Sequence, residues 1–184
     1  LEVGHTASAT RVLSKKADYT KYRSLRMFAH GDSNATYVVT PDSSDLELFL
    51  RFGADSLNYY EYVTRLFPGW DERNEIEMDL QLMSRLKAVL EQGRFDSTGE
   101  RLTVLDTVVV DAHLRDGAAA LYRVRGRPSM QQVRQLSLGV RNRSSDRVFT
   151  GQVYVDELRL DDARNDAGIA AYGRVKTQLA DFMD

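Results

Sequence analysis

The sequence contains no cysteine, and its apolar stretches are all short. The absence of cysteine excludes a disulfide scaffold, a zinc site with thiolate ligands and a cysteine nucleophile. No stretch approaches the roughly 18 consecutive apolar residues of a membrane-spanning helix, and we see no signal peptide. The chain begins Leu-Glu-Val-Gly without an initiating Met. We interpret it as a piece of a longer protein that can carry targeting and membrane segments elsewhere.

The net charge is also small, at −2. The chain therefore has no overall basic field with which to hold nucleic acid or an anionic membrane. Hydrophobic residues make up 42% of the chain and charged residues 28%, which is typical of a globular protein with a real core. A length of 184 residues allows one domain with tails. We expect an amino-terminal arm at 1–20, one domain at 21–164, and a carboxyl-terminal segment at 165–184 leading to the next part of the parent protein.

Period-two alternation of apolar residues predicts most of the domain to be strand. The clearest case is 45–53, where Leu46, Leu48, Leu50 and Phe52 share one face. A turn at 55–58 makes 59–64 its hairpin partner. Further strands are expected at the segments 22–30, 75–80, 102–110, 121–124, 135–142 and 151–160. The spacing changes to three or four residues at Met83, Leu86, Val89 and Leu90, which predicts one amphipathic helix from about Leu80 to Gln92.

The run 151–160, GQVYVDELRL, predicts a buried antiparallel strand that pairs with 135–142. Val153, Val155 and either Leu158 or Leu160 would face the core, and the break in parity allows a bulge at Asp156-Glu157. Roughly eight strands and one helix, separated by regular turn signals, favour a mainly β fold. We expect an antiparallel β-sandwich of jelly-roll (galactose-binding-like) type with one short amphipathic helix.

No enzyme signature is present in the sequence, and we expect a protein without catalytic residues or cofactor. The three histidines, His5, His30 and His113, are isolated from one another, and no nucleophile, metalloprotease or phosphate-loop motif occurs. A hydrolase of the lectin-like sandwich class would need paired carboxylates across a cleft, for which Glu47 and Glu61 are the candidates.

Acidic residues gather in and after the closing strand. Asp156, Asp161 and Asp162 could supply oxygen ligands to a structural Ca²⁺, as could Glu157 and Asp166. Small carbohydrate-binding sandwiches often end in a similar strand with calcium nearby. The plainer interpretation, which we favour because no compact DxDxD loop is present, is that these acids face water.

An aromatic cluster could form a sugar-stacking platform. Tyr60 and Tyr62 share a face of their strand, and Trp70 follows closely. Such residues in a sandwich more often pack in the core or cover an edge. Both readings remain open from the sequence.

Several stretches together resemble a known family, in that family's order. The residues 50–62, LRFGADSLNYYEY, are similar to the "RLGxDxxNYYEYE" signature of the SprA (Sov) family of giant cell-surface proteins. The other similar stretches are RMFAH at 26–30, GRPSM at 126–130, LGVRN at 138–142, VYVDELRL at 153–160, and the close from Gly168 to Phe182. Asp156, Arg127 and Tyr172 depart from the family's usual Asn, Asn and Trp.

The resemblance implies a function that composition does not show. Members of that family are outer-membrane translocons of the type IX secretion system, linked to gliding motility. This chain would then be a non-catalytic, soluble domain that shapes or gates the pore or docks partners, within a membrane-embedded parent protein. Its partners would be other translocon subunits or secreted cargo, not nucleic acid. Its place would be the cell envelope, on the periplasmic or cell-surface face of the outer membrane. The alternative is a carbohydrate-binding module of jelly-roll type.

Overall fold

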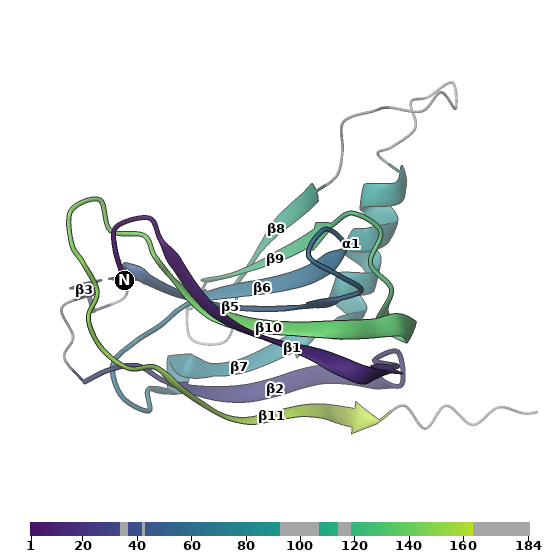
Figure 1. Cartoon of the computed structure of the whole chain (residues 1–184), viewed down its shortest axis with the longest axis horizontal. Helices are drawn as coiled ribbons and strands as arrows, with labels where there is room; N and C mark the ends of the chain where they lie inside the picture. The colour runs from purple at the N-terminus through teal and green to yellow at the C-terminus, as the bar shows by residue number, and fades with distance from the viewer. Residues whose placement is uncertain (34–36, 42, 93–106, 114–118, 164–184) are drawn as a thin grey trace, which may run out of the picture.

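The computed structural model describes residues 1–33, 37–41, 43–92, 107–113 and 119–163. Those residues form antiparallel sheets and one α-helix, so the expected β-sandwich class is confirmed (Figure 1). The strands are β1 (Thr6–Ala17), β2 (Tyr22–His30), β3 (Val38–Thr40), β4 (Ser43–Ser44), β5 (Leu46–Gly53), β6 (Tyr59–Arg65), β7 (Glu75–Asp79), β8 (Thr107–His113), β9 (Ala119–Arg125), β10 (Val133–Asn142) and β11 (Tyr154–Ala163). The helix is α1 (Leu80–Gln92), and Glu72–Asn74 and Met130–Gln132 are short 3₁₀ turns.

The larger sheet has six strands in the order β1-β10-β5-β6-β9-β8. Its centre is the β5–β6 hairpin, as the alternation predicted, with Leu50 paired to Tyr62 and Phe52 to Tyr60. The inward face of β5 is fully apolar because Leu46, Leu48, Leu50 and Phe52 alternate with outward residues, and each is 1% exposed or less. The strand expected at 102–110 is observed from Thr107, and 102–106 lie outside the described residues.

The smaller sheet has three strands in the order β11-β2-β7, and it lies beneath the larger one in Figure 1. Leu25, Met27 and Ala29 of β2 point into the space between the sheets, at 1% exposure or less. Asp79 ends β7 and caps α1, because its Oδ1 accepts hydrogen bonds from the amides of Gln81 and Leu82 at 2.7 and 3.0 Å. Helix α1 contacts β2, β8 and β9 and so closes one end of the core.

The helix occupies the residues expected of it, and of the four apolar residues expected to face the core only Val89 does not. Leu80, Met83, Leu86 and Leu90 are buried, whereas Val89 is 54% exposed. Residues at 80, 83, 86 and 90 follow the three- and four-residue steps of a helix facing one side, and position 89 lies beyond that stripe.

The closing strand was predicted correctly as a strand but wrongly as a buried one. Strand β11 lies at the edge of the smaller sheet and most of its side chains are exposed. It pairs with β2, not with 135–142, because that strand already has β1 and β5 as its neighbours. The expected bulge is confirmed: the register shifts between Asp156 and Arg159, and Glu157 has φ of 54°. Leu160 packs against the core and Leu158 does not.

The expected amino-terminal arm at 1–20 is instead mostly strand. Strand β1 pairs antiparallel with β10, with Thr6 opposite Arg141 and Val12 opposite Gln135. Nearly all its side chains are exposed, so β1 joins the sheet through its backbone and lacks the apolar alternation that reveals a strand. The expected carboxyl-terminal segment at 165–184 lies outside the described residues. The two main sheets hold six and three strands, β3 pairs with β4 in a small third sheet, and the jelly-roll topology stays a prediction.

The core contains several buried tyrosines whose phenols resist ionisation. Burial raises the pKa of Tyr60, Tyr62 and Tyr122 above the ordinary value of 10, and burial with the nearby Asp32 raises that of Tyr37 to about 12. The unfolded chain therefore loses these protons first as the pH rises. The stability that the neutral phenols contribute is complete below pH 10 and is lost as the pH rises through the raised values.

We therefore expect the free energy of unfolding to fall steeply above about pH 10, and Tyr62→Phe to make that fall shallower. Urea unfolding followed by fluorescence between pH 8 and 12 measures both. At pH 8 the phenols are protonated in both states, which separates the packing effect of the substitution from its effect on titration. Parallel curves for the two proteins across this range would contradict the expectation.

Candidate functional site

The outward face of the larger sheet carries a buried charge network across three strands. Glu61 of β6 is 0% exposed and lies opposite Arg51 of β5 and Arg123 of β9. Arg123 Nη1 donates to Glu61 Oε1 at 2.6 Å, and Arg51 Nε donates to the other carboxylate oxygen. Next to Arg51 on the same face lie Ser137 of β10 and Thr10 of β1, whose hydroxyl oxygens are 2.7 Å apart. Both oxygens of Glu61 are occupied, so its carboxylate serves to join strands.

Aromatic rings fix the position of the same arginine. The guanidinium of Arg51 lies 4.6 Å from the centre of the Phe49 ring and 4.9 Å from that of Tyr59. The Phe49 ring in turn lies over Gly139 on the neighbouring strand. A Cβ at Gly139 would stand 2.6 Å from Phe49 Cζ and 2.4 Å from the carbonyl oxygen of Ala7. Glycine is required at that position because a ring covers it.

Glu47 lies on the same face but belongs to a separate ion pair. Its carboxylate accepts from Arg141 at 3.2 Å and lies 3.7 Å from Arg143. Glu47 is opposite Arg65, four residues along β6 from Glu61, which separates the two glutamates by about 13 Å. Glycosidase carboxylates stand roughly 5 to 9.5 Å apart. The pairing of Glu47 with Glu61 as a hydrolase site is therefore wrong.

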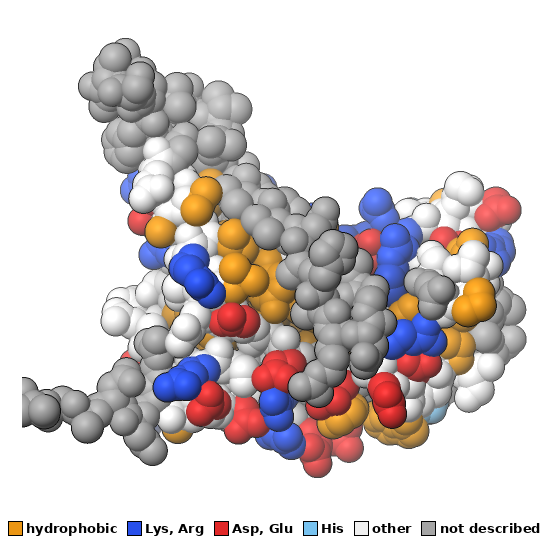
Figure 2. Space-filling model, turned by 180° about the vertical axis from the view of Figure 1, so that it is seen from behind, with side chains coloured by type: hydrophobic (Ala, Val, Ile, Leu, Met, Phe, Trp, Pro, Cys, Tyr) orange, Lys and Arg blue, Asp and Glu red, His pale blue; other side chains and the backbone are white. Residues whose placement is uncertain are grey.

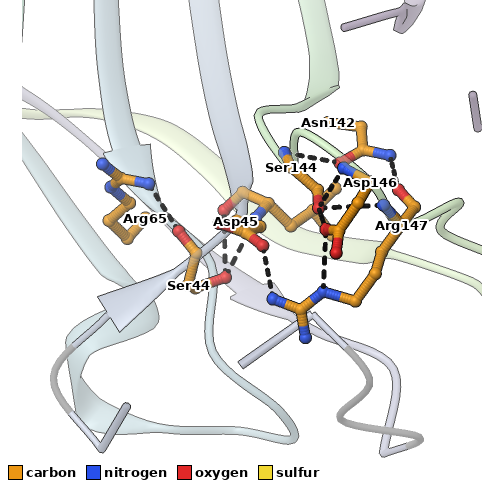
Figure 3. A network of polar contacts seen from close by, with 8 residues as sticks. Ser44, Asp45, Arg65, Asn142, Ser144, Asp146 and Arg147 are labelled. Atoms are coloured by element: carbon orange, nitrogen blue, oxygen red, sulfur yellow. Dashed lines mark hydrogen bonds and ion pairs between the residues drawn. The ribbon is translucent and has the colours of Figure 1, made fainter. Parts of the chain in front are cut away.

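A second polar network fastens the loop that follows β10 (Figure 3). The buried Asn142 accepts from the Ser144 amide at 3.0 Å and donates to the Arg147 carbonyl at 2.7 Å. Ser144 Oγ accepts from the Arg147 amide at 3.0 Å, and Arg147 Nη2 reaches Asp45 Oδ2 at 2.7 Å. Asn142 thus holds the loop in its conformation, and its role is structural.

The turn between β5 and β6 is held in the same manner. Asp55 Oδ1 accepts from the amides of Leu57 and Asn58 at 2.8 and 2.9 Å, and these bonds lower the pKa of the Asp55 carboxyl. Asn58 Oδ1 then accepts from the Arg127 amide at 2.8 Å. Gly126, with φ of 67°, allows the two turns to meet at this close range.

The aspartates proposed for Ca²⁺ are spread along β11, and two of them lie near arginines. Asp161 lies 3.6 Å from Arg26, and Asp162 lies 3.7 Å from Arg23. Asp156 is five residues, or roughly 15 Å, along the strand from Asp161. In the part of the chain that the structure describes, no group of three or more metal-ligating side chains comes together. Asp166 lies outside that part.

The three residues proposed for sugar stacking are separated by the fold. Tyr60 and Tyr62 are each 1% exposed and pack between the sheets, so neither ring can meet a ligand. Trp70 is 61% exposed and has different companions. Its ring lies 5.0 Å from that of His30, which lies 5.8 Å from the ring of Tyr154, itself 55% exposed. We call Trp70, His30 and Tyr154 the aromatic row.

Two backbone bonds explain why the aromatic row forms. Gly31, after β2, and Gly69, before Trp70, exchange amide-to-carbonyl hydrogen bonds of 2.8 and 3.3 Å. Tyr154 lies directly opposite His30 in the β11–β2 register. Periodicity within one segment could not reveal this row, because its members come from three segments. Nδ1 of His30 is buried and without a hydrogen-bond partner within the described structure.

An apolar cavity of about 620 Å³ lies between the edge strands of the six-stranded and three-stranded sheets. Ala7 and Ala9 line it from β1, and Val153 and Val155 from the segment entering and beginning β11. Its other lining residues are Leu1, Ser8, Leu48, Leu138, Gly139, Val140, Phe149, Thr150 and Gly151. We call it the edge groove. Sequence patterns did not predict the edge groove, because β1 was not expected to be a strand.

Acidic and basic side chains of the described residues form ion pairs on the surface. Figure 2 shows acidic and basic side chains interspersed on the face it presents. Pairs such as Arg26 with Glu77 at 2.7 Å account for the mixing. None of the helices among the described residues is long and apolar enough to span a membrane.

Comparison with protein families decides the identity of the chain. The model of the SprA_N family, described as motility related/secretion protein, matches residues 1–184. The chain belongs to this family. No curated protein matches the chain. Membership associates this SprA_N chain with motility or secretion, and hence with the cell envelope and other secretion components.

The motifs that resembled the family prove to be framework residues of this SprA_N chain. In NYYEY, Asn58 holds a turn and Glu61 joins the central strands. In LGVRN, Gly139 makes room for the Phe49 ring and Asn142 holds a loop in place. These residues therefore identify the fold, whereas other residues of the same motifs lie on the exposed features. His30 and Tyr154 belong to the aromatic row, and the edge groove is lined in part by Leu138, Val140, Val153 and Val155.

Removal of the central carboxylate should destabilise the SprA_N fold strongly. Glu61→Ala would leave two guanidiniums facing each other around a void, at a cost of about 3–5 kcal/mol in the free energy of unfolding. Glu157→Gln, at a side chain that is 56% exposed, is the control and should stay within about 0.5 kcal/mol. Urea unfolding at pH 7 checks both, and equal stabilities would contradict the role assigned to Glu61.

Proposed function

We propose that this SprA_N chain is a non-catalytic docking domain of an outer-membrane protein-translocation component of type IX secretion and gliding motility. In this role it shapes or gates the export path by binding other translocon subunits or cargo. The observation that carries the proposal is the edge groove. A cavity of about 620 Å³ with mostly apolar walls opens between two sheet edges that have no partner strand among the described residues.

An apolar hollow of this kind favours binding over catalysis. Ligand sites are typically concave and apolar, and cavities of 300–1,000 Å³ are usual for them. A catalytic site also needs convergent titratable groups. In the described structure the carboxylates with the least exposure, Glu61 and Glu47, are each neutralised by two arginines and lie on the outward sheet face, away from the groove.

The test is a charge placed in the groove of the intact parent protein. Ala9→Asp introduces a carboxylate at an exposed position of the groove wall, where a docked apolar surface would have to desolvate it. We expect cells carrying this variant to secrete cargo and spread on a surface about tenfold less well, the effect of roughly 1.4 kcal/mol in binding.

Val12→Asp is the matched control, since Val12 is 74% exposed and lies on the opposite face of the same strand. It should secrete and spread normally. Immunoblots of the outer membrane establish that both variants accumulate equally. Normal secretion by Ala9→Asp at normal abundance would rule out docking in the groove.

The aromatic row supports carbohydrate binding as a second candidate function. An exposed indole and an exposed phenol, each in contact with the imidazole of His30, offer stacking faces for a pyranose ring, with polar groups at the rim. Tyr154 Oη donates to the Gln152 side chain, which places an amide at that rim.

A glycan array followed by calorimetry tests this second candidate. Saturable binding that Trp70→Ala abolishes would establish it, provided that Leu57→Ala, at another side chain 61% exposed, leaves binding unchanged. An array without saturable binding would remove the candidate. The docking proposal does not depend on this result, because the edge groove shares no residue with the row.

A further inference from the structure

We infer that the edge groove accepts an extended strand from a partner protein, a strand with apolar residues at every second position that adds to the open edge of β1. This inference rests on the proposed docking function and specifies the chemistry of the partner. Three observations support the inference: the backbone groups at the outer edge of β1, the residues that line the edge groove, and the residue types along the edge.

Within the described structure, β1 is an edge strand with a neighbour on one side only. The Asn142 amide donates to the His5 carbonyl at 3.0 Å, which makes this a hydrogen-bonded position of the β1–β10 ladder. Antiparallel ladders alternate between bonded and non-bonded pairs. The amide and carbonyl groups of Thr6, Ser8 and Thr10 therefore point away from β10. The 2.7 Å contact between Thr10 and Ser137 hydroxyls agrees, because side chains approach most closely in non-bonded pairs.

The walls of the groove repeat at the spacing of a strand. Three elements each contribute two residues that stand two positions apart, namely Ala7 and Ala9, Leu138 and Val140, and Val153 and Val155. Residues at i and i+2 of a strand lie on one face, roughly 6.6 Å apart. A partner strand beside β1 would turn every second side chain inward against these pairs.

The open edge lacks the usual protection against such pairing. Exposed edges normally carry charges, proline or an early bulge. Residues 6–10 of β1, TASAT, contain none of these; the first charge on the strand is Arg11, and Lys15 and Lys16 follow after the ladder shifts register beyond Val12. The unguarded stretch is thus the same stretch that lines the groove.

A foreign strand fits this site better than a second copy of the chain. Pairing of two β1 edges would bring Ala7 and Ala9 of each copy to the groove of the other. Their methyl groups are too small to fill a cavity of about 620 Å³. The occupant must instead supply larger side chains, such as Val, Ile, Leu or Phe, at alternate positions.

Peptide binding to the 184-residue chain tests the inference. The probe is a fluorescein-labelled octapeptide of alternating Val and Thr, and its control is an isomer with four Val followed by four Thr. We expect saturable fluorescence anisotropy with the alternating peptide, at least tenfold tighter than with the isomer. Ser8→Pro, which removes an outward amide, should weaken binding at least tenfold, whereas Ser8→Ala should not change it. Ala9→Asp should weaken it also, and circular dichroism melting establishes that each variant is folded.

Three results would overturn the inference. Equal binding of the two isomers would mean a general apolar surface, and no saturable binding would mean that the groove takes no strand. A concentration-dependent dimer that Ser8→Pro abolishes would make a second copy the occupant. The docking function itself is judged by secretion in cells, so a secretion defect in Ala9→Asp without peptide binding would retain the function and reject only the strand.

Discussion

The sheet depends above all on one carboxylate shared by two guanidiniums. Isolated burial of Glu61 would cost several kcal/mol, and Arg51 and Arg123 offset that cost only when β5, β6 and β9 are in register. A slip of one residue would turn every side chain of a strand to the other face and leave the charges unpaired. The ion pairs of Glu61 therefore fix which residues face inward. The composition of the core, the packing of α1 and the position of β10 in the sheet all depend on that choice.

The sequence predicted those parts of the fold that local patterns determine. The β5–β6 hairpin and helix α1 follow from alternation and spacing within single segments, and the bulge at Glu157 follows from a break in parity. Strand β1 could not be predicted in this way, because its contribution is backbone pairing with β10 and its side chains carry no pattern. The partner of β11 was assigned wrongly for a related reason: alternation indicates a strand but does not say which neighbour it has.

For the candidate sites as well, local sequence patterns predicted some features and missed those that depend on contacts between distant segments. Tyr60 and Tyr62 were correctly placed on one face of a strand, but only the three-dimensional arrangement shows that this face is the core. Trp70 is exposed, yet its companions come from distant segments that Gly31 and Gly69 bring together. The family motifs locate glycines, an asparagine and a glutamate that hold turns and register. Function in this SprA_N chain is consequently expected on the exposed edges and surfaces that these framework residues hold in place, and other residues of the same motifs lie on those surfaces.

The pairing of β1 with β10 also constrains how the domain folds. Thr6 pairs with Arg141, so within the described structure β1 finds its partner strand in a segment that is made much later. Contacts between such distant residues form slowly, because a long loop must close before any bond compensates for the lost entropy. The β5–β6 hairpin can form early, whereas the outer strand can be added only after β10 has been made. The domain therefore passes through a stage with β10 as an uncovered edge, and it completes its sheet last on the side where the edge groove lies.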